Sequence, residues 1–468
     1  MNDLSLPPRM PGGLLFGSGP EAVADPLALY TRAQRTLGDV VRLRGIPGIN
    51  WYLITHPSGV EHVLKTRGRN YRKPDRFNAP VRMLAGNGIL AAEGDTWLQN
   101  RRLMQPAFHR QRLAGLVTQM AEGAEVAAER WERLAAEGAE VDVGEEMLRL
   151  TLRIVGTTLF SHDLSGDADA LGQAIRTSFA TVSKRMTMPL APPAWLPTAE
   201  NRRFGAARDV VHRTVDAMIA ERRRSGEQRP DLLQMLLDAQ DAETGARMDD
   251  RQVRYEALTL MIAGHETAAA SMSWMWYLLA RNPDAAIKLR EELDSVLAGR
   301  TPGVEDLPRL PYTRAVFDET LRLYPPAWGQ PRESVEEDEI GGYRIPARNI
   351  VMVCQWVTHR RPDLWERPDD FVPERFVGPA REAIQPFAYY PFGAGARMCI
   401  GNSFALMEAQ VALATLAQRF EPELVPGQDI VPDATFTLRP KHGVRMRIRR
   451  RPPAAAGAAP STNLARAG

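Results

Sequence analysis

The sequence predicts a mainly α-helical fold with a minor β region, and three observations lead to this fold class. Residues 109–226 follow a helical pattern that is rich in Ala, Glu and Arg. Residues 249–282 form a second helical stretch, where Asp249 and Gln252 have capping-box spacing and Pro283 disfavours helix at the last residue. Short apolar runs predict strands instead, at residues 40–44, 51–55, 340–346 and 349–354, the last two as a hairpin.

The composition is that of an ordinary globular protein. The chain has 468 residues, 44% of them hydrophobic and 25% charged, and a net charge of +2, which gives no field pointing to nucleic acid. Its two cysteines, Cys354 and Cys399, exclude a disulfide-built secreted fold and fit a reducing, cytoplasmic compartment. The N-terminus has no basic region followed by an apolar one, so we expect neither a signal peptide nor a membrane anchor.

The chain divides into three parts. Residues 1–23, rich in Pro and Gly, predict an extended N-terminal arm, residues 24–450 a single domain, and the low-complexity residues 451–468 a disordered tail. Within the domain, residues 67–92 have an irregular, loop-like pattern that mixes apolar residues with Pro, Asn and Gly. Residues 186–197 make a Pro-rich break between two long helical stretches.

The centre of the 249–282 helix carries polar residues in an apolar setting. His265 and Glu266 argue against a membrane span, since a central charged residue costs about 2.5–3.5 kcal/mol on insertion scales. Gly264 would let a flat group lie against the backbone, and the Thr267 hydroxyl can bond back to an upstream carbonyl. A buried acid beside a hydroxyl can relay protons, although a strained but purely structural helix is an equal alternative from these residues alone.

A second informative stretch surrounds Cys399. This cysteine lies in a glycine-punctuated loop that includes Gly393 and Gly401, where positive φ angles and a close approach to a bulky group are expected. A helical pattern follows at once, and a thiol near the start of a helix lies close to the positive end of the helix dipole, which favours thiolate. Such a thiolate can be a nucleophile, a redox sensor or a metal ligand, and the alternative is a buried, inert cysteine.

The loop matches the pattern F-G-x-G-x-R-x-C-x-G, with its residues at Phe392, Gly393, Gly395, Arg397, Cys399 and Gly401. In this it resembles the haem-ligand loop of the cytochrome P450 family. The resemblance implies that family's helical prism, crossed by a long central (I-type) helix. It also implies haem b (iron protoporphyrin IX) as cofactor, with Cys399 as the axial iron ligand.

Two further motifs resemble the same family. Residues 263–267 match its A-G-x-E-T oxygen-activation segment, which implies that Thr267 orders a water for proton delivery and that Glu266 helps to supply protons. Glu319 and Arg322 match its E-x-x-R pair, and Arg375 supplies the downstream partner. The resemblance implies one structural network of these three residues that holds the Cys399 loop, whereas spacing alone allows a surface ion pair.

The resemblance also implies a set of cofactor contacts, which are Trp97, Arg101, Gly264, Arg332, Phe392, Gly393, Arg397 and Gly401. Among these, the indole of Trp97 and the guanidinium groups are pure donors suited to the haem propionates. The candidate substrate-pocket residues are Phe77, Met83, Leu84, Leu90, Ala263, Ala327, Trp328 and Phe436. Because these are mainly apolar, we expect a hydrophobic substrate such as a fatty acid, terpenoid or polyketide.

The function that follows from the resemblance is monooxygenation, the insertion of one atom of O2 into a C–H or C=C bond. The sequence has no flavin or iron–sulfur segment, so electrons are expected from a separate ferredoxin or flavodoxin-type donor with its reductase, and the chain is expected to act as a monomer. One alternative is a peroxide-driven peroxygenase, which in this family typically lacks the acid–alcohol pair present at Glu266 and Thr267. The other is a non-catalytic haem-thiolate protein that binds a ligand or senses a gas.

Overall fold

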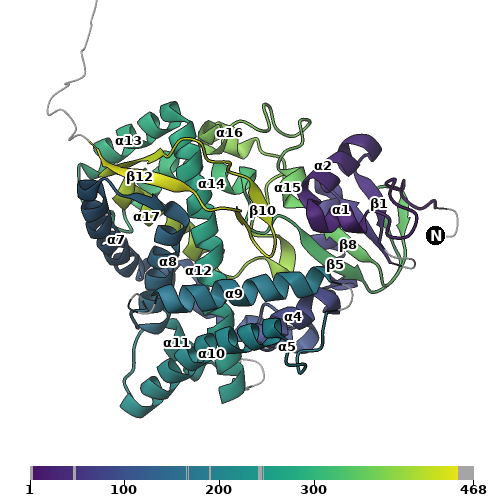
Figure 1. Cartoon of the computed structure of the whole chain (residues 1–468), viewed down its shortest axis with the longest axis horizontal. Helices are drawn as coiled ribbons and strands as arrows, with labels where there is room; N and C mark the ends of the chain where they lie inside the picture. The colour runs from purple at the N-terminus through teal and green to yellow at the C-terminus, as the bar shows by residue number, and fades with distance from the viewer. Residues whose placement is uncertain are drawn as a thin grey trace, which may run out of the picture.

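The computed structural model describes residues 4–45, 49–164, 166, 168–188, 191–240, 245 and 247–451. The N-terminal elements and the largest sheet lie at one end of the molecule, and helices make up most of the rest (Figure 1). This confirms the predicted mainly helical fold with a minor β region. The predicted disordered tail lies outside the described residues, except for Arg451.

The longest α-helices lie in the middle of the chain. Their bounds are α1 (Gly19–Ala24), α2 (Pro26–Leu37), α3 (Pro57–Glu61), α4 (Asp75–Ala85), α5 (Gly94–Met104), α6 (Arg110–Ala114), α7 (Val117–Glu137), α8 (Val143–Phe160), α9 (Ala168–Thr187), α10 (Ala199–Ser225), α11 (Leu232–Asp238), α12 (Asp250–Arg281), α13 (Pro283–Leu297), α14 (Pro311–Leu323), α15 (Gln355–Thr358), α16 (Gly378–Glu382) and α17 (Asn402–Ala417).

The strands are short, and some of them pair with strands that are distant in sequence. Their bounds are β1 (Val40–Arg44), β2 (Asn50–Ile54), β3 (Tyr71–Arg72), β4 (Glu140–Asp142), β5 (Gln330–Ser334), β6 (Asp338–Ile340), β7 (Tyr343–Ile345), β8 (Ile350–Val353), β9 (Phe420–Leu424), β10 (Pro432–Ala434), β11 (Leu438–Pro440) and β12 (Arg445–Arg450). The largest sheet has the order β1-β2-β8-β5-β3, and β10 pairs with β11 in a separate hairpin.

The hairpin predicted at residues 340–346 and 349–354 is wrong. Instead, β7 pairs with β6, while β8 lies between β2, to which it runs parallel, and the antiparallel β5. The β8 strand is buried over Val351, Met352 and Val353, so it is a central strand of the sheet. An apolar run shows that a strand is buried, but it does not show which strands lie beside it.

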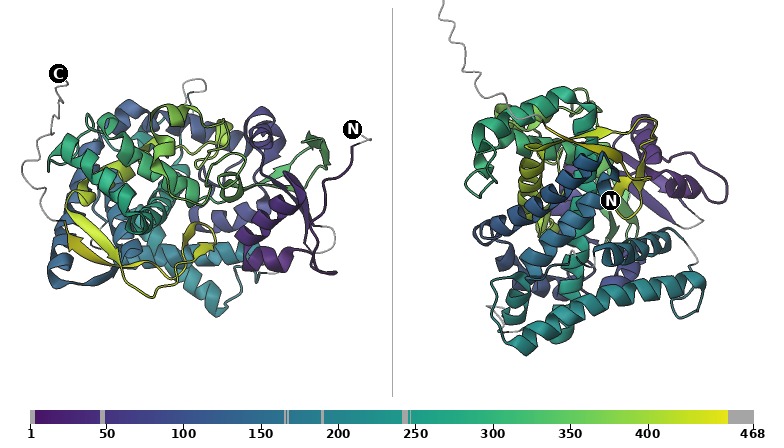
Figure 2. Two further views of the ribbon diagram at one scale, coloured as in Figure 1. Left: turned by 90° about the horizontal axis from the view of Figure 1, so that it is seen from above. Right: turned by 60° about the vertical axis from the view of Figure 1, so that its left-hand side comes forward.

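The central helix α12 agrees with the sequence prediction. The Asp249 carboxylate accepts a hydrogen bond from the backbone N–H of Gln252 at 2.7 Å, and the helix ends at Arg281 before Pro283. The helix packs against α8 and α14, and it runs through the interior of the molecule in both views of Figure 2. Its side chains are buried over most of its length, which explains why it has no polar stripe. No helix in the described part of the chain is long and apolar enough to cross a membrane.

Two segments predicted to be irregular contain helices. The proposed extended arm ends in α1, which begins at Gly19, and residues 75–85 of the predicted irregular stretch form α4. Pro80 lies inside α4 and obscured its pattern, since proline is unfavourable in a helix interior. The apolar side of α4, with buried Val81 and Leu84, packs into the main core.

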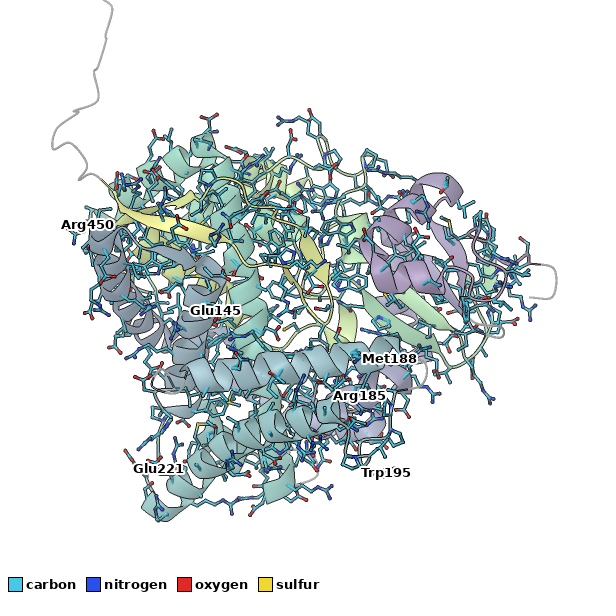
Figure 3. All side chains as sticks on the ribbon, viewed as in Figure 1. Glu145, Arg185, Met188, Trp195, Glu221 and Arg450 are labelled. Atoms are coloured by element: carbon cyan, nitrogen blue, oxygen red, sulfur yellow. The ribbon has the colours of Figure 1, made fainter. Side chains whose placement is uncertain are left out.

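The connection between α9 and α10 corresponds to the predicted Pro-rich break. The two helices lie side by side, and Met188 and Trp195 lie in the connection at one end of the pair (Figure 3). Arg185 of α9 donates hydrogen bonds to the Pro192 carbonyl at 2.9 Å and to Asn201 Oδ1 of α10 at 2.7 Å. Residues 189 and 190 of the break lie outside the described residues.

Candidate active site

The loop that carries Cys399 is shaped by glycines and by a neighbouring helical turn. Gly393 and Gly395 have φ angles of +70° and +67°. A Cβ atom on Gly395 would lie 2.0 Å from the carbonyl oxygen of Leu64, which belongs to the π-helical turn η1 (His62–Thr66). The loop closes through the Cys399 N–H, which donates to the Phe392 carbonyl at 2.9 Å. Only glycine tolerates this combination of angle and close approach at position 395.

Gly401 departs from the prediction. Its φ is −86°, in a region open to any residue, and a Cβ atom there would meet only the Cys399 sulfur at 4.0 Å. Gly401 is instead the N-cap residue of α17, and its backbone N–H lies close to the Cys399 thiol. Its role is therefore to bring a donor to the sulfur without steric crowding.

The expectation of a lowered Cys399 pKa is also wrong for the protein alone. Part of the side chain is accessible, yet the surrounding chain excludes enough water that desolvation raises the pKa of the thiol. The Gly401 N–H and the Arg101 guanidinium favour the thiolate, but their effect is smaller. The helix dipole thus does not outweigh the cost of placing a negative charge here.

One face of α12 stays partly accessible in an otherwise buried stretch. Ala263, Gly264 and Thr267 are half-buried, whereas His265 and Glu266 between them are buried. The Thr267 hydroxyl donates to the Ala263 carbonyl one turn earlier at 2.8 Å, as the sequence predicted. A Cβ atom on Gly264 would lie 3.3 Å from Val155, so helix packing also restricts this position to a small residue.

Glu266 is a buried acid with an unusual pKa. Its Oε1 accepts a hydrogen bond from the Thr437 hydroxyl at 3.1 Å, and its Oε2 has no hydrogen-bond partner among the described residues. Burial raises the pKa of Glu266 to about 7, against smaller opposing effects of Arg439, Thr437 and Arg176. A carboxyl group with this pKa can both hold and release a proton near neutral pH.

His265 does not share in this chemistry. The ring is buried, and neither of its nitrogens is hydrogen-bonded to any residue that the structure describes. Burial lowers the pKa of His265 to about 4, and the nearby Arg176 acts in the same direction. The residue is therefore neutral at physiological pH, in line with its interpretation as a packing residue.

Three cations surround a single carboxylate close to the Cys399 loop. Arg397 Nη2 lies 2.7 Å from Glu93 Oε2, and its guanidinium stacks over the Trp97 ring at 4.3 Å. Its Nη1 is buried and has no hydrogen-bond partner within the described part of the chain. Arg332 is 8% exposed, and burial together with Arg397 lowers its pKa to about 10. Lys73 is the third cation, and its pKa falls to about 7 for the same two reasons.

Lys73 and Glu93 were missed by the sequence interpretation. Lys73 lies in a turn-like Tyr-Arg-Lys-Pro stretch, and Glu93 precedes α5, so no motif or spacing marks either residue. Arg101 was predicted together with Trp97, but its Nη1 donates to the Met398 carbonyl at 2.9 Å, beside Cys399. The sequence therefore pointed to these arginines but could not show which groups they contact.

The structure brings Glu319, Arg322 and Arg375 together. The buried guanidinium of Arg322 contacts both carboxylate oxygens of Glu319 at 2.7 Å, and Arg375 Nε lies 3.4 Å from Glu319 Oε1. The Val372 N–H donates to the same carboxylate at 2.9 Å. The network therefore joins α14 to the short 3₁₀ turn η6 (Pro373–Phe376).

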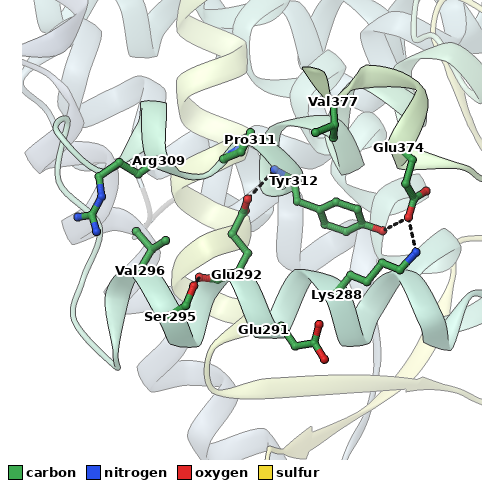
Figure 4. A pocket seen from close by; sticks show the side chains of 10 residues that line it. All are labelled: Lys288, Glu291, Glu292, Ser295, Val296, Arg309, Pro311, Tyr312, Glu374 and Val377. Atoms are coloured by element: carbon green, nitrogen blue, oxygen red, sulfur yellow. Dashed lines mark hydrogen bonds and ion pairs between the residues drawn. The ribbon is translucent and has the colours of Figure 1, made fainter. Parts of the chain in front are cut away.

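Residues that line a surface pocket between α13 and α14 hold the η6 turn from its outer side. Figure 4 shows Lys288 and Tyr312 both contacting the carboxylate of Glu374, at 2.6 and 3.3 Å. Glu374 immediately precedes Arg375, so these contacts fix the backbone from which Arg375 reaches Glu319. The residues that line this pocket include none of the predicted site residues.

The pocket candidates do not all lie together. Leu84 is buried in the main core, against which Met83, Leu90 and Phe436 pack, and the Phe436 ring stacks on Phe179 with centroids 4.7 Å apart. Phe77 is half-buried on α4, and Ala327 is exposed. Trp328 packs instead into a smaller core with Tyr30 and Met352, and its Nε1 donates to the Thr435 carbonyl at 3.1 Å.

These features define a class of protein. A lone cysteine on a glycine-shaped loop precedes α17, which packs against α12 with its buried acid and hydroxyl, and cations gather beside the loop. This is the arrangement of a haem-thiolate enzyme. The family model described as cytochrome P450 matches residues 7–446, and the chain belongs to this family.

Relatives and a solved structure agree with this assignment. Cyclooctatin synthase of Streptomyces melanosporofaciens is 37% identical over 430 residues, which are 92% of each chain. Cyclooctat-9-en-7-ol 5-monooxygenase of the same organism is 36% identical over 432 residues, covering 90% of this chain and 92% of that protein. The crystal structure of the cytochrome P450DA heme domain matches with a TM-score of 0.87 and 29% identity, over 96% of this chain and 98% of that one.

The protein is therefore a P450 monooxygenase with haem b as its cofactor. The residues present fit this group. The thiol of Cys399 is a soft ligand for iron, and the partnerless Nη1 of Arg397 is a donor for a haem carboxylate. Arg332 and Arg397 share Glu93 as their nearby acid, so they carry more positive charge than this acid offsets, and a haem propionate would offset the rest.

Proposed function

We propose that this monooxygenase inserts one oxygen atom into a C–H or C=C bond of a hydrophobic, terpenoid-like small molecule. The single observation that carries the proposal is the state of the acid–hydroxyl pair on α12. Glu266 is buried with a pKa raised to about 7, and Thr267 beside it is half-buried and donates its hydroxyl hydrogen to the Ala263 carbonyl. Such a pair can deliver protons, which an enzyme that uses O2 needs because activation of O2 consumes protons.

The cofactor supplies, when bound, the oxygen chemistry that a thiolate-ligated iron favours. The chain supplies the rest. Cys399 would hold the iron, and the Gly401 N–H and Arg101 would stabilise its negative charge. Arg332 and Arg397 would hold the propionates, with the Trp97 indole packed under the guanidinium of Arg397.

Proton delivery follows from the hydrogen bonds of α12. The Thr267 hydroxyl donates its one hydrogen to the Ala263 carbonyl. Its oxygen can therefore accept a hydrogen bond from a water and hold that water in place. Burial raises the pKa of Glu266 to about 7, so its carboxyl group can supply the proton near neutral pH. Thr437 donates to one oxygen of Glu266 and so fixes the carboxyl orientation.

A hydrophobic substrate is supported by the candidate pocket and by the relatives. Met83, Leu84, Leu90 and Phe436 gather at the main core. One relative is named for a cyclic alkenol, cyclooctat-9-en-7-ol, which is itself largely apolar. The spectral shift of the haem on titration with the polycyclic terpene alcohol cedrol, compared with palmitic acid, tests the substrate class. Tighter binding of a charged, polar molecule than of both would contradict it.

The electron donor is proposed to be a separate ferredoxin or flavodoxin-type protein with its own reductase. Arg102, Arg110 and Arg112 are exposed beside α5, whose Arg101 contacts the Cys399 loop, and they could meet an acidic partner. Replacing all three by Glu should slow reduction by an acidic ferredoxin. Unchanged reduction kinetics would remove this surface from the proposal.

We further propose a cytoplasmic monomer, and the two free cysteines fit such a reducing compartment.

The acid–hydroxyl pair is tested with Thr267→Ala and its matched control Thr267→Ser, which keeps the hydroxyl. In a monooxygenase, Thr267→Ala should lower product formed per NAD(P)H consumed and release peroxide, while Thr267→Ser should stay close to the wild type. A peroxygenase would be indifferent to both changes when driven by peroxide. Equal coupling of Thr267→Ala and the wild type would therefore contradict the proposed role.

A further inference from the structure

The segment between α4 and α5, residues 86–93, is held against α12 by buried side chains. The Ile89 N–H donates to the Glu256 carboxylate of α12 at 2.8 Å. Gln252, one turn earlier, donates to the Asn87 carbonyl at 3.3 Å and to the other oxygen of Glu256 at 2.7 Å. Glu256 is 0% exposed and its bond to Ile89 is buried, whereas Gln252 is half-buried.

The carbonyl groups of the same segment are bound from the opposite side. The Lys73 ammonium donates to the carbonyls of Ile89, at 3.2 Å, and Leu90, and lies 3.5 Å from that of Ala92. Asn78 of α4 donates to the carbonyl of Ala91 at 3.1 Å. Side chains therefore bind four consecutive carbonyls, from 89 to 92. A loop normally leaves such groups to solvent, so this one is built to hold a fixed shape.

Two glycines let the segment lie directly on α12. A Cβ atom on Gly88 would lie 2.1 Å from Thr259 Oγ1, and one on Gly86 would lie 2.0 Å from a ring carbon of Tyr255. Gly86 also has a φ of +71°. No larger residue fits at either position unless the segment moves away from the helix.

The two charged residues of this arrangement also connect it to the cofactor site. Lys73 faces Arg397 and Arg332, the proposed propionate ligands, as well as Glu93 and Glu256. Burial raises the pKa of Glu256 to about 7, and the Ile89 N–H, Gln252 and Lys73 act in the opposite direction. Lys73 thus touches the segment with its ammonium group and lies within electrostatic range of the site where two carboxylates of haem would bind.

We propose that Glu256 and Lys73 are positioning residues that fix the 86–93 segment as a wall of the substrate pocket, and that Lys73 couples this wall to the anionic edge of the haem. The proposal rests on the proposed function in one respect, that Leu90 faces substrate. Neither residue touches the reacting atoms. Their effect is on how tightly a bulky ligand is enclosed, and not on the ligation of the iron.

Amide hydrogen exchange in the holoenzyme tests the positioning role without any substrate. Glu256→Leu removes the acceptor of the Ile89 N–H and should speed exchange at Ile89 by about tenfold or more, the equivalent of leaving one buried N–H unpaired. Glu256→Gln keeps an acceptor oxygen and should restore slow exchange. Lys73→Met should loosen residues 89–92, whereas the control Lys65→Met, at a solvent-exposed ion pair, should not.

The pocket role is read from two iron-binding probes. Phenylimidazole carries a phenyl ring that imidazole lacks. If the 86–93 segment is the pocket wall, Glu256→Leu should weaken phenylimidazole by several-fold and leave imidazole unchanged. Exchange at Ile89 equal to wild type in Glu256→Leu would overturn the positioning role. Equal loss for both probes, or for neither, would overturn the pocket role. The proposed substrate class can fail separately, through the terpene titration, because neither probe depends on it.

Discussion

The replacement of Arg322 by methionine should prevent the protein from folding around its cofactor. Arg322 is fully buried, and each of its five N–H groups has an acceptor. Two bind the carboxylate of Glu319, and the others bind the carbonyls of His359 at 2.8 Å, Pro368 at 2.6 Å and Asp370 at 2.9 Å. Methionine fills a similar volume and satisfies none of these acceptors.

The expected loss follows from these contacts. Removing one partner of a buried ion pair costs about 3–5 kcal/mol, and the lower end applies because Glu319 keeps Arg375 and the Val372 N–H. The buried carbonyl of His359 also loses its donor, which adds about 1–3 kcal/mol. The carbonyls of Pro368 and Asp370 are only partly buried, so they add less. The total is at least about 4 kcal/mol, which is a large share of the stability of many domains. Arg322→Lys keeps the charge but offers three donors instead of five, so its loss should be intermediate.

The assay is urea unfolding, followed by haem absorbance and by the haem-to-protein ratio after purification. Arg314→Met is the matched control, because Arg314 lies on the same helix and pairs with Asp318 at 2.9 Å. Asp318 keeps Arg381 at 2.6 Å, so the control should cost less than about 1 kcal/mol. If Arg322→Met bound haem and unfolded at the same urea concentration as the control, the network would not hold the fold.

Three further outcomes are expected. In a pH profile, kcat should fall as the pH rises through about 7. The reason is that a proton donor must be protonated and burial raises the pKa of Glu266 to about this value. Glu266→Gln should abolish the fall. His265 should add no second step there, since its pKa is lowered to about 4. Arg397→Gln should speed haem transfer to an acceptor protein by about tenfold or more, whereas the exposed Arg445 replaced by Gln should not. Cys399→Ser should remove the thiolate signature from the ferrous carbonyl spectrum, and a retained signature would place the iron ligand elsewhere.

The parts of the site that sequence could predict are those whose determinants are local. The offsets of Gly395 and Cys399 define a loop, and those of Glu266 and Thr267 place an acid and a hydroxyl on one turn of helix. Arg375 was named as the partner of Glu319 and Arg322 only because the family's motif is known. In each case a few consecutive residues carry the information.

What could not be predicted depends on contacts between distant segments. Strand β8 joins β2 and β5, which lie about 300 and 20 residues earlier in the chain, and its own sequence is only an apolar run. Lys73 and Glu93 belong to the cation cluster through tertiary contacts, so no spacing marks them. The sign of the Cys399 pKa shift was wrong because desolvation by the whole fold outweighs one helix terminus.

The bonded backbone of the 86–93 segment gives a physical reason for a hydrophobic substrate. A wall made of loop backbone usually offers carbonyl acceptors to a polar ligand. Here Lys73 and Asn78 bind the carbonyls from 89 to 92, and Glu256 accepts the Ile89 N–H. In the proposed pocket, Leu90 would face the ligand, while the carbonyls from 89 to 92 and the Ile89 N–H are already engaged. A ligand that needs hydrogen bonds would have to break these buried ones, at a cost of about 1–3 kcal/mol for each group left unpaired, and an apolar ligand would not.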